Sequence, residues 1–174
     1  DKIISLWSKI NSNLIEVKTY EEAEIIKLMT NSYRDLTFAF SNEMNRIISK
    51  YNINSHDLIF KANSGYTRNN IPIPSPGVGG SCLVKDPILF RKYHKGPGYK
   101  LARIEREINE DALKNVENIT NRTAKKISLR RKIKVFILGL TFKGYPENTD
   151  IRESSGLKLF EKLKQKHNVK VFDL

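Results

Sequence analysis

The fold is decided by residues 19–51, which read TYEEAEIIKLMTNSYRDLTFAFSNEMNRIISKY. Apolar side chains recur in this stretch every three or four residues, which is the spacing of one face of an α-helix. Its first residues fit a capping box, in which the Thr19 hydroxyl and the Glu22 carboxylate accept from backbone amides at the start of a helix. The pattern predicts a single helix of about 30 residues, well above the usual length. Its apolar stripe consists of Ile26, Met29, Tyr33, Leu36, Phe40, Met44, Ile47 and Tyr51.

The segments on either side of this helix are short. A helix of such length needs a surface on which to bury its stripe, and a second copy of itself across a dimer axis is one candidate. Residues 1–18 predict a short helix followed by a strand at Leu14–Val17. After the long helix, residues 52–54 break the pattern, and Ser55 is expected to cap a short helix that runs to Asn63.

Residues 64–81 are not expected to form regular structure. Pro72, Pro74 and Pro76 alternate with other residues, and three glycines follow them. Prolines restrict the backbone to extended conformations, whereas glycines permit positive φ or the close approach of a ligand. A long loop inside a compact domain is usually functional or disordered, and the stiffening prolines favour a functional loop here.

The C-terminal part predicts a charged helix followed by a βαβ unit. Residues 101–129 have helical spacing, Ile133–Gly139 is a buried type of strand, Ser154–Lys166 is an amphipathic helix, and Val169–Asp173 is a second strand. Such a unit is the start of a doubly wound sheet. Because two strands bury too little surface to form an independent domain, the chain is expected to be truncated at this end.

Composition limits the function only loosely. The chain has 174 residues with 31 Lys plus Arg against 19 Asp plus Glu, a net charge of +12. This surplus favours anionic partners, although solvated helix faces explain it equally well, and nucleic-acid binding remains an alternative that rests on charge alone. The single cysteine rules out an internal disulfide and suits a reducing cytoplasm. His56, His94 and His167 are far apart in sequence, so a structural metal is not expected.

The N-terminal residues lack the pattern of a signal peptide, and no apolar run is long enough to cross a membrane.

The sharpest chemical signal is the segment 76–87, which reads PGVGGSCLVKDP. A thiol becomes a nucleophile when nearby cations or backbone amides stabilise its thiolate. The glycines before Cys82 expose backbone amides, and Lys85 can supply positive charge if a helical turn follows. A small, inert, buried cysteine beside a turn is the alternative interpretation.

Three blocks of the chain, in order, resemble the UDP-glucose/GDP-mannose dehydrogenase family. Residues 77–86 resemble its Gly-x-Gly-Gly-x-Cys-x-x-Lys-Asp active-site loop, and residues 24–35 resemble its Glu-x-x-Lys-Leu-x-x-Asn-x-aromatic helix. Residues 137–143 and 148–154 resemble the opening of its nucleotide-sugar-binding domain. Together the blocks cover most of residues 19–174, and the chain looks most like the UDP-N-acetyl-D-mannosamine dehydrogenase branch.

The resemblance implies an enzyme that oxidises the C6 alcohol of a nucleotide sugar twice, to a carboxylate, with two NAD+. It implies that Cys82 attacks the C6 aldehyde and that the adduct passes through a thioester. Lys27 and Asn31, which are four residues apart on one helix face, would direct donors at the oxygen of C6. Asp86 would orient water or the Lys27 amine. Without the cysteine loop, Lys27 and Asn31 would be interpreted as an ordinary exposed pair.

The resemblance also implies contacts with substrate and cofactor. Arg68 would reach the sugar in a neighbouring subunit, which implies a homodimer with shared sites. The backbone of residues 73–79 would line the sugar, and Phe142 would approach the nucleotide. Arg152 would meet the pyrophosphate of NAD. The substrate-binding candidates are Arg68, Gly77, Val78, Gly79, Phe142 and Lys143, and the cofactor-binding candidates are Lys85 and Arg152.

By this resemblance the chain divides into three parts. Residues 1–18 are the tail of a missing NAD-binding domain, and residues 19–129 are a mainly α central dimerisation and catalytic domain. Residues 130–174 are the truncated start, a first βαβ unit, of a Rossmann-like domain that binds the nucleotide sugar. Because the Gly-x-Gly-x-x-Gly turn that holds a dinucleotide is absent, the chain alone is expected to be inactive.

Alternatives stay open for both the substrate and the function of the chain. Residues 31–35 and 74–78 look more like the branch that acts on UDP-N-acetylhexosamines, whereas Ser81-Cys82 with Lys85-Asp86 looks more like the UDP-glucose branch. The balance leans toward the N-acetylhexosamine. A non-catalytic dimerisation or nucleotide-sugar-binding module is the alternative to an enzyme.

Overall fold

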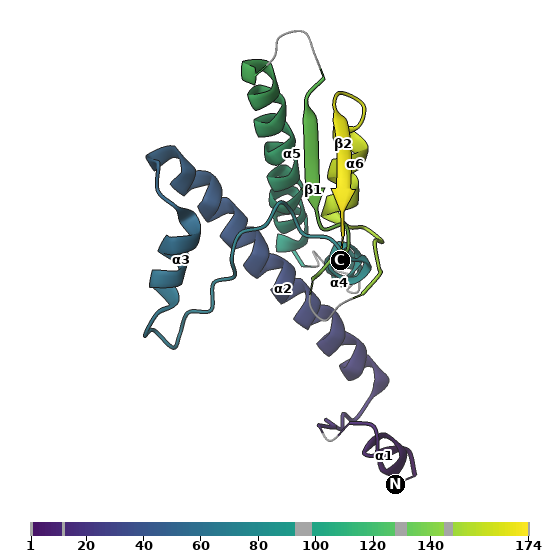
Figure 1. The fold of residues 1–174 in the computed structure, drawn as a ribbon. Helices are drawn as coiled ribbons and strands as arrows, with labels where there is room; N and C mark the ends of the chain where they lie inside the picture. Colours follow the sequence, from purple (N-terminus) through teal and green to yellow (C-terminus); the bar gives the residue numbers. More distant parts are fainter. Residues whose placement is uncertain (1, 12, 93–98, 128–131, 145–147, 174) are drawn as a thin grey trace.

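The computed structural model describes residues 2–11, 13–92, 99–127, 132–144 and 148–173. The predicted boundary at 129/130 and His94 lie outside these residues. Two long helices cross at the centre, α2 (Tyr20–Ile48) and α5 (Leu101–Ile127), and α4 (Ser81–Lys92) packs against both (Figure 1). A βαβ unit follows α5. The prediction of a mainly α domain followed by one βαβ unit is confirmed.

Helix α2 has 29 residues, so the predicted long helix is confirmed. The Thr19 hydroxyl accepts from the amide of Glu22 at 3.2 Å, as a capping box requires. The Glu22 carboxylate reaches one residue further back than expected, to the amide of Lys18 at 2.7 Å. Both ends of the capping interaction therefore satisfy amides that the helix itself leaves unpaired.

The two faces of α2 are used in an unexpected way. Its apolar stripe is largely exposed, with 65% of Tyr33, 49% of Met29 and 48% of Phe40 open to solvent. At 3.6 residues per turn, the opposite face holds most of the helix's buried residues. These are mainly polar: Asn31, Ser32, Asp35, Ala39, Ser41 and Asn42. Within the described chain, α2 thus turns polar side chains inward and keeps its apolar stripe outward.

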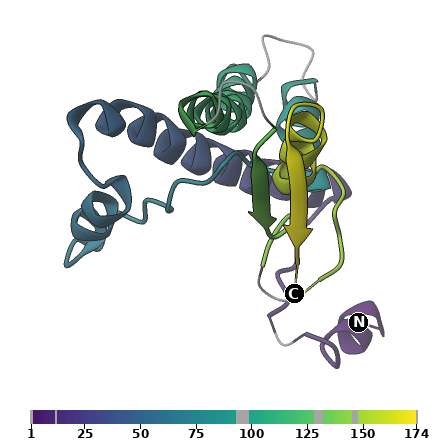
Figure 2. The same ribbon diagram turned by 45° about the horizontal axis from the view of Figure 1, so that its top comes forward.

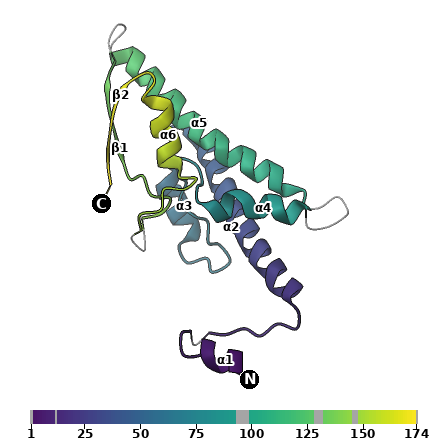
Figure 3. The same cartoon turned by 90° about the vertical axis from the view of Figure 1, so that its right-hand side faces the viewer.

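Two local predictions are wrong. Leu14–Val17 pairs with no described strand, because a strand needs a hydrogen-bonded neighbour and β1 and β2 pair only with each other. The segment links α1 (Lys2–Trp7), which stands apart from the rest, to α2 (Figures 2 and 3). Ser55 is also not the cap of its helix.

The cap of α3 (Ser55–Asn63) is Asn54, whose side-chain oxygen accepts from the amide of His56 at 2.9 Å. The Ser55 hydroxyl instead donates to Asn45 on α2 at 2.6 Å, which ties α3 to the end of the long helix. A short 3-10 turn, Ser49–Tyr51, separates the two helices.

The βαβ unit consists of β1 (Lys134–Leu138), α6 (Ser155–Leu163) and β2 (Asn168–Phe172). The strands are parallel, and Ile137 lies opposite Val171. Figure 3 shows α6 and α5 on one side of the strands. The small apolar core on that side consists of Leu113, Ile137, Leu159 and Leu163.

The proline-rich segment runs without regular structure from α3 back along α2 to α4 (Figure 2), as predicted. Side chains of α2 hold it: the Ser41 hydroxyl donates to the carbonyl of Pro72 at 2.5 Å, and Asn42 accepts from the amide of Ser75 at 2.9 Å. No described helix is long and apolar enough to cross a lipid bilayer.

Candidate functional site

Cys82 is the second residue of α4 and is exposed. The helix begins where the amide of Val84 donates to the carbonyl of Gly80 at 3.3 Å. An exposed thiol in the first turn of a helix can meet a ligand, which a buried structural cysteine cannot. The alternative interpretation of Cys82 as a buried cysteine is therefore wrong.

The glycines before Cys82 press directly against the segment that precedes α6. A Cβ on Gly79 would lie 2.4 Å from the carbonyl oxygen of Glu153, and a Cβ on Gly80 would lie 2.8 Å from the Phe142 ring. The amide of Gly80 also donates to the Glu153 carbonyl at 3.2 Å. These contacts place Cys82 at the junction between the helical part and the βαβ unit.

Asn31 and Asp86 meet across the α2–α4 interface. The Asn31 amide donates to the Asp86 carboxylate at 2.5 Å, and both side chains are nearly buried. Asp86 follows Cys82 by four residues on α4, so the two share a helix face. Lys27 is exposed one turn before Asn31 on α2. The structure thus brings the motif residues of two distant sequence blocks to one place.

A buried polar network lies beneath this site. Asp35 accepts from Arg106 at 3.1 Å and from the Asn109 amide at 2.8 Å, which joins α2 to α5. Asn109 in turn accepts from Asn42 at 2.9 Å. Sequence reasoning did not single out any of these four residues as functional. For Arg106 and Asn109 the reason is that α5 carries no family motif and its charges resemble a solvated face.

Two buried carboxyls in this region have shifted pKa values. Burial raises the pKa of Asp35 to about 6, although the charge of Arg106 and the Asn109 hydrogen bond favour its ionised form. Burial raises the pKa of Glu105 to about 7, against the opposing effect of a 2.8 Å hydrogen bond from the Tyr99 hydroxyl. Burial and this same carboxylate raise the pKa of Tyr99.

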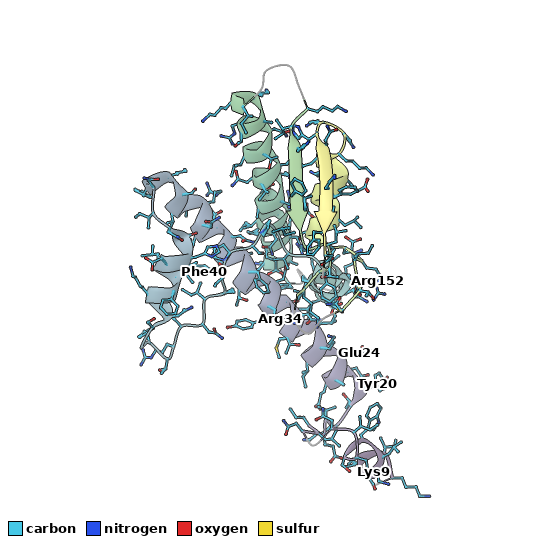
Figure 4. All side chains as sticks on the ribbon, viewed as in Figure 1. Lys9, Tyr20, Glu24, Arg34, Phe40 and Arg152 are labelled. Carbon is cyan, nitrogen blue, oxygen red and sulfur yellow. The ribbon has the colours of Figure 1, made fainter. Side chains whose placement is uncertain are left out.

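Arg152 lies at the end of the βαβ unit that meets α4 (Figure 4). Its guanidinium makes two hydrogen bonds to Asp150, at 2.9 and 2.7 Å, and these hold the pKa of Asp150 at about 2. Hydrogen bonds and charge from Asp150 raise the pKa of Arg152, and the charge of an ionised Cys82 adds a smaller effect in the same direction. Because the Glu153 carbonyl contacts Gly79 and Gly80, the neighbouring Arg152 belongs to the segment that meets the Cys82 loop.

The remaining candidates are spread around this centre. The ammonium of Lys143 lies 5.6 Å from the centre of the Phe142 ring, and that ring packs against Gly80. Lys85 is exposed on α4. Arg68 lies in the turn after α3, at the opposite end of the proline-rich segment from α4 (Figure 1). Arg68 is thus the candidate that the fold separates from Cys82.

The substrate-binding candidates Gly77, Val78 and Gly79 also have structural roles. The carbonyl of Val78 accepts from Arg106 at 3.3 Å. A Cβ on Gly77 would lie 3.1 Å from the Asn109 carbonyl, so this glycine lets the loop approach α5. Tight packing is therefore one reason for glycine in this loop, independent of any ligand.

A cavity of about 290 Å³ lies elsewhere, between α2, α3, α5 and residues 74–76. None of the catalytic candidates lines it, although three residues of the loop expected to line the sugar, Pro74, Ser75 and Pro76, border it. The described residues also contain no group of three His, Cys, Asp or Glu side chains arranged to hold a metal ion.

Comparison with known proteins finds relatives in one family. The model of the UDP-glucose/GDP-mannose dehydrogenase family, central domain, matches residues 21–111. A UDP-N-acetyl-D-mannosamine dehydrogenase of Methanococcus vannielii is 35% identical over 170 residues, which are 95% of this chain and 38% of that protein. One from Methanocaldococcus jannaschii is 40% identical over 168 residues, 94% of this chain and 37% of that protein.

A solved structure gives the same result. The UDP-D-ManNAc dehydrogenase of Pyrococcus horikoshii superimposes with a TM-score of 0.77 at 34% identity, over 87% of this chain and 36% of that one. The chain spans less than two fifths of the length of the relatives that it matches.

Proposed function

Because the chain belongs to the UDP-glucose/GDP-mannose dehydrogenase family, we propose that the complete protein oxidises C6 of a nucleotide sugar to a carboxylate, with Cys82 as the nucleophile. The observation that carries the proposal is the junction of three motif residues: an exposed Cys82, with Asp86 one turn later on the same helix and hydrogen-bonded to Asn31 at 2.5 Å. The activity is assigned to the complete protein because the chain spans only 38% of such a relative.

The chemistry follows from what each residue can donate or accept. Oxidation of the C6 alcohol gives an aldehyde, and addition of the Cys82 thiolate to it forms a C–S bond and leaves negative charge on oxygen. The Asn31 amide carries two hydrogens and Asp86 takes one, so the second can donate to that oxygen together with the Lys27 ammonium. After hydride loss, water attacks the resulting thioester, the C–S bond breaks, and the acid and the free thiol are released.

NAD is the cofactor that the proposal requires, and when bound it accepts the two hydrides that leave C6. The described residues fit part of such a site. Arg152 presents an exposed guanidinium that Asp150 holds in a fixed orientation near Cys82, which suits a pyrophosphate. Lys85 adds a second exposed cation one turn into α4. The positive charges of Arg152 and Lys85 would hold the anionic part of the cofactor beside the nucleophile.

The proposed substrate is UDP-N-acetyl-D-mannosamine, because relatives so named match 95% and 94% of this chain. The preference for an N-acetylhexosamine in the sequence motifs supports the same choice. Phe142 and Lys143 are proposed to contact the nucleotide side of the substrate, since their pair lies directly beyond Gly80.

The working unit is proposed to be a homodimer. The exposed apolar stripe of α2 runs opposite its polar, buried face, and an exposed stripe of that length is typical of an interface. A second copy packed on α2 would also provide the neighbouring sugar for Arg68, which lies away from its own Cys82.

The test of the function is NADH formation by the complete natural protein with UDP-N-acetyl-D-mannosamine, and with UDP-glucose for comparison. We expect two NADH for each uronate formed by the parent, and no uronate from Cys82→Ser, because the serine adduct cannot give a labile thioester. Uronate formation by Cys82→Ser at the parent rate would refute the nucleophile. Binding of the UDP sugar without turnover by the parent protein would instead support a binding module.

A further inference from the structure

Pro87 creates a gap in the hydrogen bonding of α4. It lies inside the helix and has no backbone N–H, so the usual bond to the carbonyl of Leu83 cannot form. That carbonyl accepts instead from Arg106 at 3.1 Å. The same guanidinium donates to the carbonyl of Val78 at 3.3 Å. Since these carbonyls lie on either side of Cys82 in sequence, one side chain from α5 fixes the backbone both before and after the thiol.

Arg106 is itself held in place. Its guanidinium donates to Asp35 at 3.1 Å, and the Asn109 amide donates to the same oxygen of Asp35 at 2.8 Å. The side chains of Arg106 and Asp35 are only 10% and 0% exposed. The guanidinium therefore has one rigid position, set by α2 and α5 together, from which it reaches the loop and α4.

Stability alone does not account for this arrangement. In the described part of the chain, the second oxygen of Asp35 and the Nε of Arg106 are buried without a hydrogen-bond partner. Burial also raises the pKa of Asp35 to about 6, which is the signature of a costly buried charge. A buried ion pair with unsatisfied atoms is often no more stable than an apolar replacement. A role in fixing the backbone around Cys82 explains why such an ion pair is useful here.

We propose that Arg106 is a positioning residue for Cys82, acting through the backbone carbonyls of Val78 and Leu83. Without the guanidinium, the backbone around Cys82 would lose two of its fixed points, one at Val78 before α4 and one at Leu83 inside it. The expected effect of Arg106 on turnover rests on the proposed function, whereas its expected effect on the Cys82 thiol does not.

The chain has a single cysteine, so alkylation by iodoacetamide reports on Cys82 alone. We expect Arg106→Gln to retain its helical circular dichroism and to react at least about threefold more slowly at neutral pH, because the thiol is no longer held in its exposed position at the start of α4. The matched control is Arg103→Gln, which changes an exposed arginine on the same helix and should react at the parent rate. An unchanged rate in folded Arg106→Gln would overturn the proposal.

A rescue experiment separates positioning from general stability. Pro87→Ala restores a backbone N–H that can bond to the carbonyl of Leu83. In the Arg106→Gln background it should return the alkylation rate toward that of the parent. If Arg106 served stability only, the midpoint of urea unfolding would shift in Arg106→Gln and in the double variant, but Pro87→Ala would not restore the alkylation rate. The proposal would then fail.

If Arg106→Gln does not fold, Arg106→Lys decides the matter. Lysine keeps the charge but lacks the planar fork that reaches two carbonyls, so an intermediate alkylation rate is expected and a parental rate refutes the proposal. In the complete enzyme, Arg106→Lys should lower kcat and leave KM for the sugar nucleotide nearly unchanged. If the parent enzyme shows no turnover, the proposed function fails, while the alkylation rates still decide the role of Arg106.

Discussion

Asp35 is a carboxyl that the fold places in the protein interior, and its protonation should influence stability. Its pKa rises from 3.8 to about 6 on folding, so the native state binds the proton more tightly than the unfolded state does. This contribution to stability is complete below pH 3.8 and is lost as the pH rises through about 6. Glu105 acts in the same direction, between 4.5 and about 7.

We therefore expect the free energy of unfolding to fall as the pH rises from about 4 to about 7, by an amount of the order of 3 kcal/mol from Asp35. Urea unfolding at a series of pH values measures this slope. Asp35→Asn should reduce it to the part that Glu105 contributes, because the amide does not titrate. Asp57→Asn, at an exposed carboxyl on α3, should keep the parental slope. Equal slopes in the parent and Asp35→Asn would show that this carboxyl does not retain its proton on folding.

Individual residues differ in how well the sequence predicted them. Cys82, Asn31 and Asp86 belong to motifs, and the family resemblance implied that they share one site. Arg106 and Asn109 lie on a charged helix without a motif, and polar residues of that kind are normally solvated. Their burial depends on how α2, α4 and α5 cross, which is a tertiary property that helical spacing does not contain.

At the scale of elements, the glycine loop and the segment before α6 form one joint. The carbonyl of Glu153 occupies the space that a side chain on Gly79 would need. Both partners are backbone, so neither can move aside as a flexible side chain would. The sequence predicted the loop from its prolines and glycines, but the partner of the loop lies more than 70 residues away and could not be identified from local pattern.

Gly79→Ala should therefore destabilise the protein by about 1–3 kcal/mol, the usual cost of overpacking. Its Cβ would lie 2.4 Å from the Glu153 oxygen and 2.9 Å from the Ser155 nitrogen. Gly144→Ala is the matched control, since no atom lies within 4 Å of a Cβ there. Urea unfolding measures both variants. Equal midpoints for the two would mean that the loop and the βαβ unit are not in such close contact.

The whole molecule turns the polar face of its longest helix inward and the apolar face outward. Spacing predicted the stripe and the length of α2, but it could not predict which face the chain itself would bury. The reason is that Asn31, Asp35 and Asn42 find hydrogen-bond partners on α4 and α5, which offsets part of the cost of burying them. The apolar stripe then stays exposed, and it is the surface on which the proposed homodimer depends.

A charge in the middle of the stripe should break the proposed homodimer. Phe40 is 48% exposed on α2, and Phe40→Glu would place a carboxylate where a dimer buries apolar surface (Figure 4). We expect the dimer dissociation constant to rise by about two orders of magnitude, because loss of a central aromatic contact and burial of an unpaired charge each cost a few kcal/mol. Sedimentation equilibrium measures it. Arg34→Glu is a larger charge change six residues earlier and about 120° around the axis of the same helix, and it should leave the constant nearly unchanged. If Phe40→Glu remains as dimeric as the parent, or the parent is monomeric throughout, the stripe of α2 is not the interface.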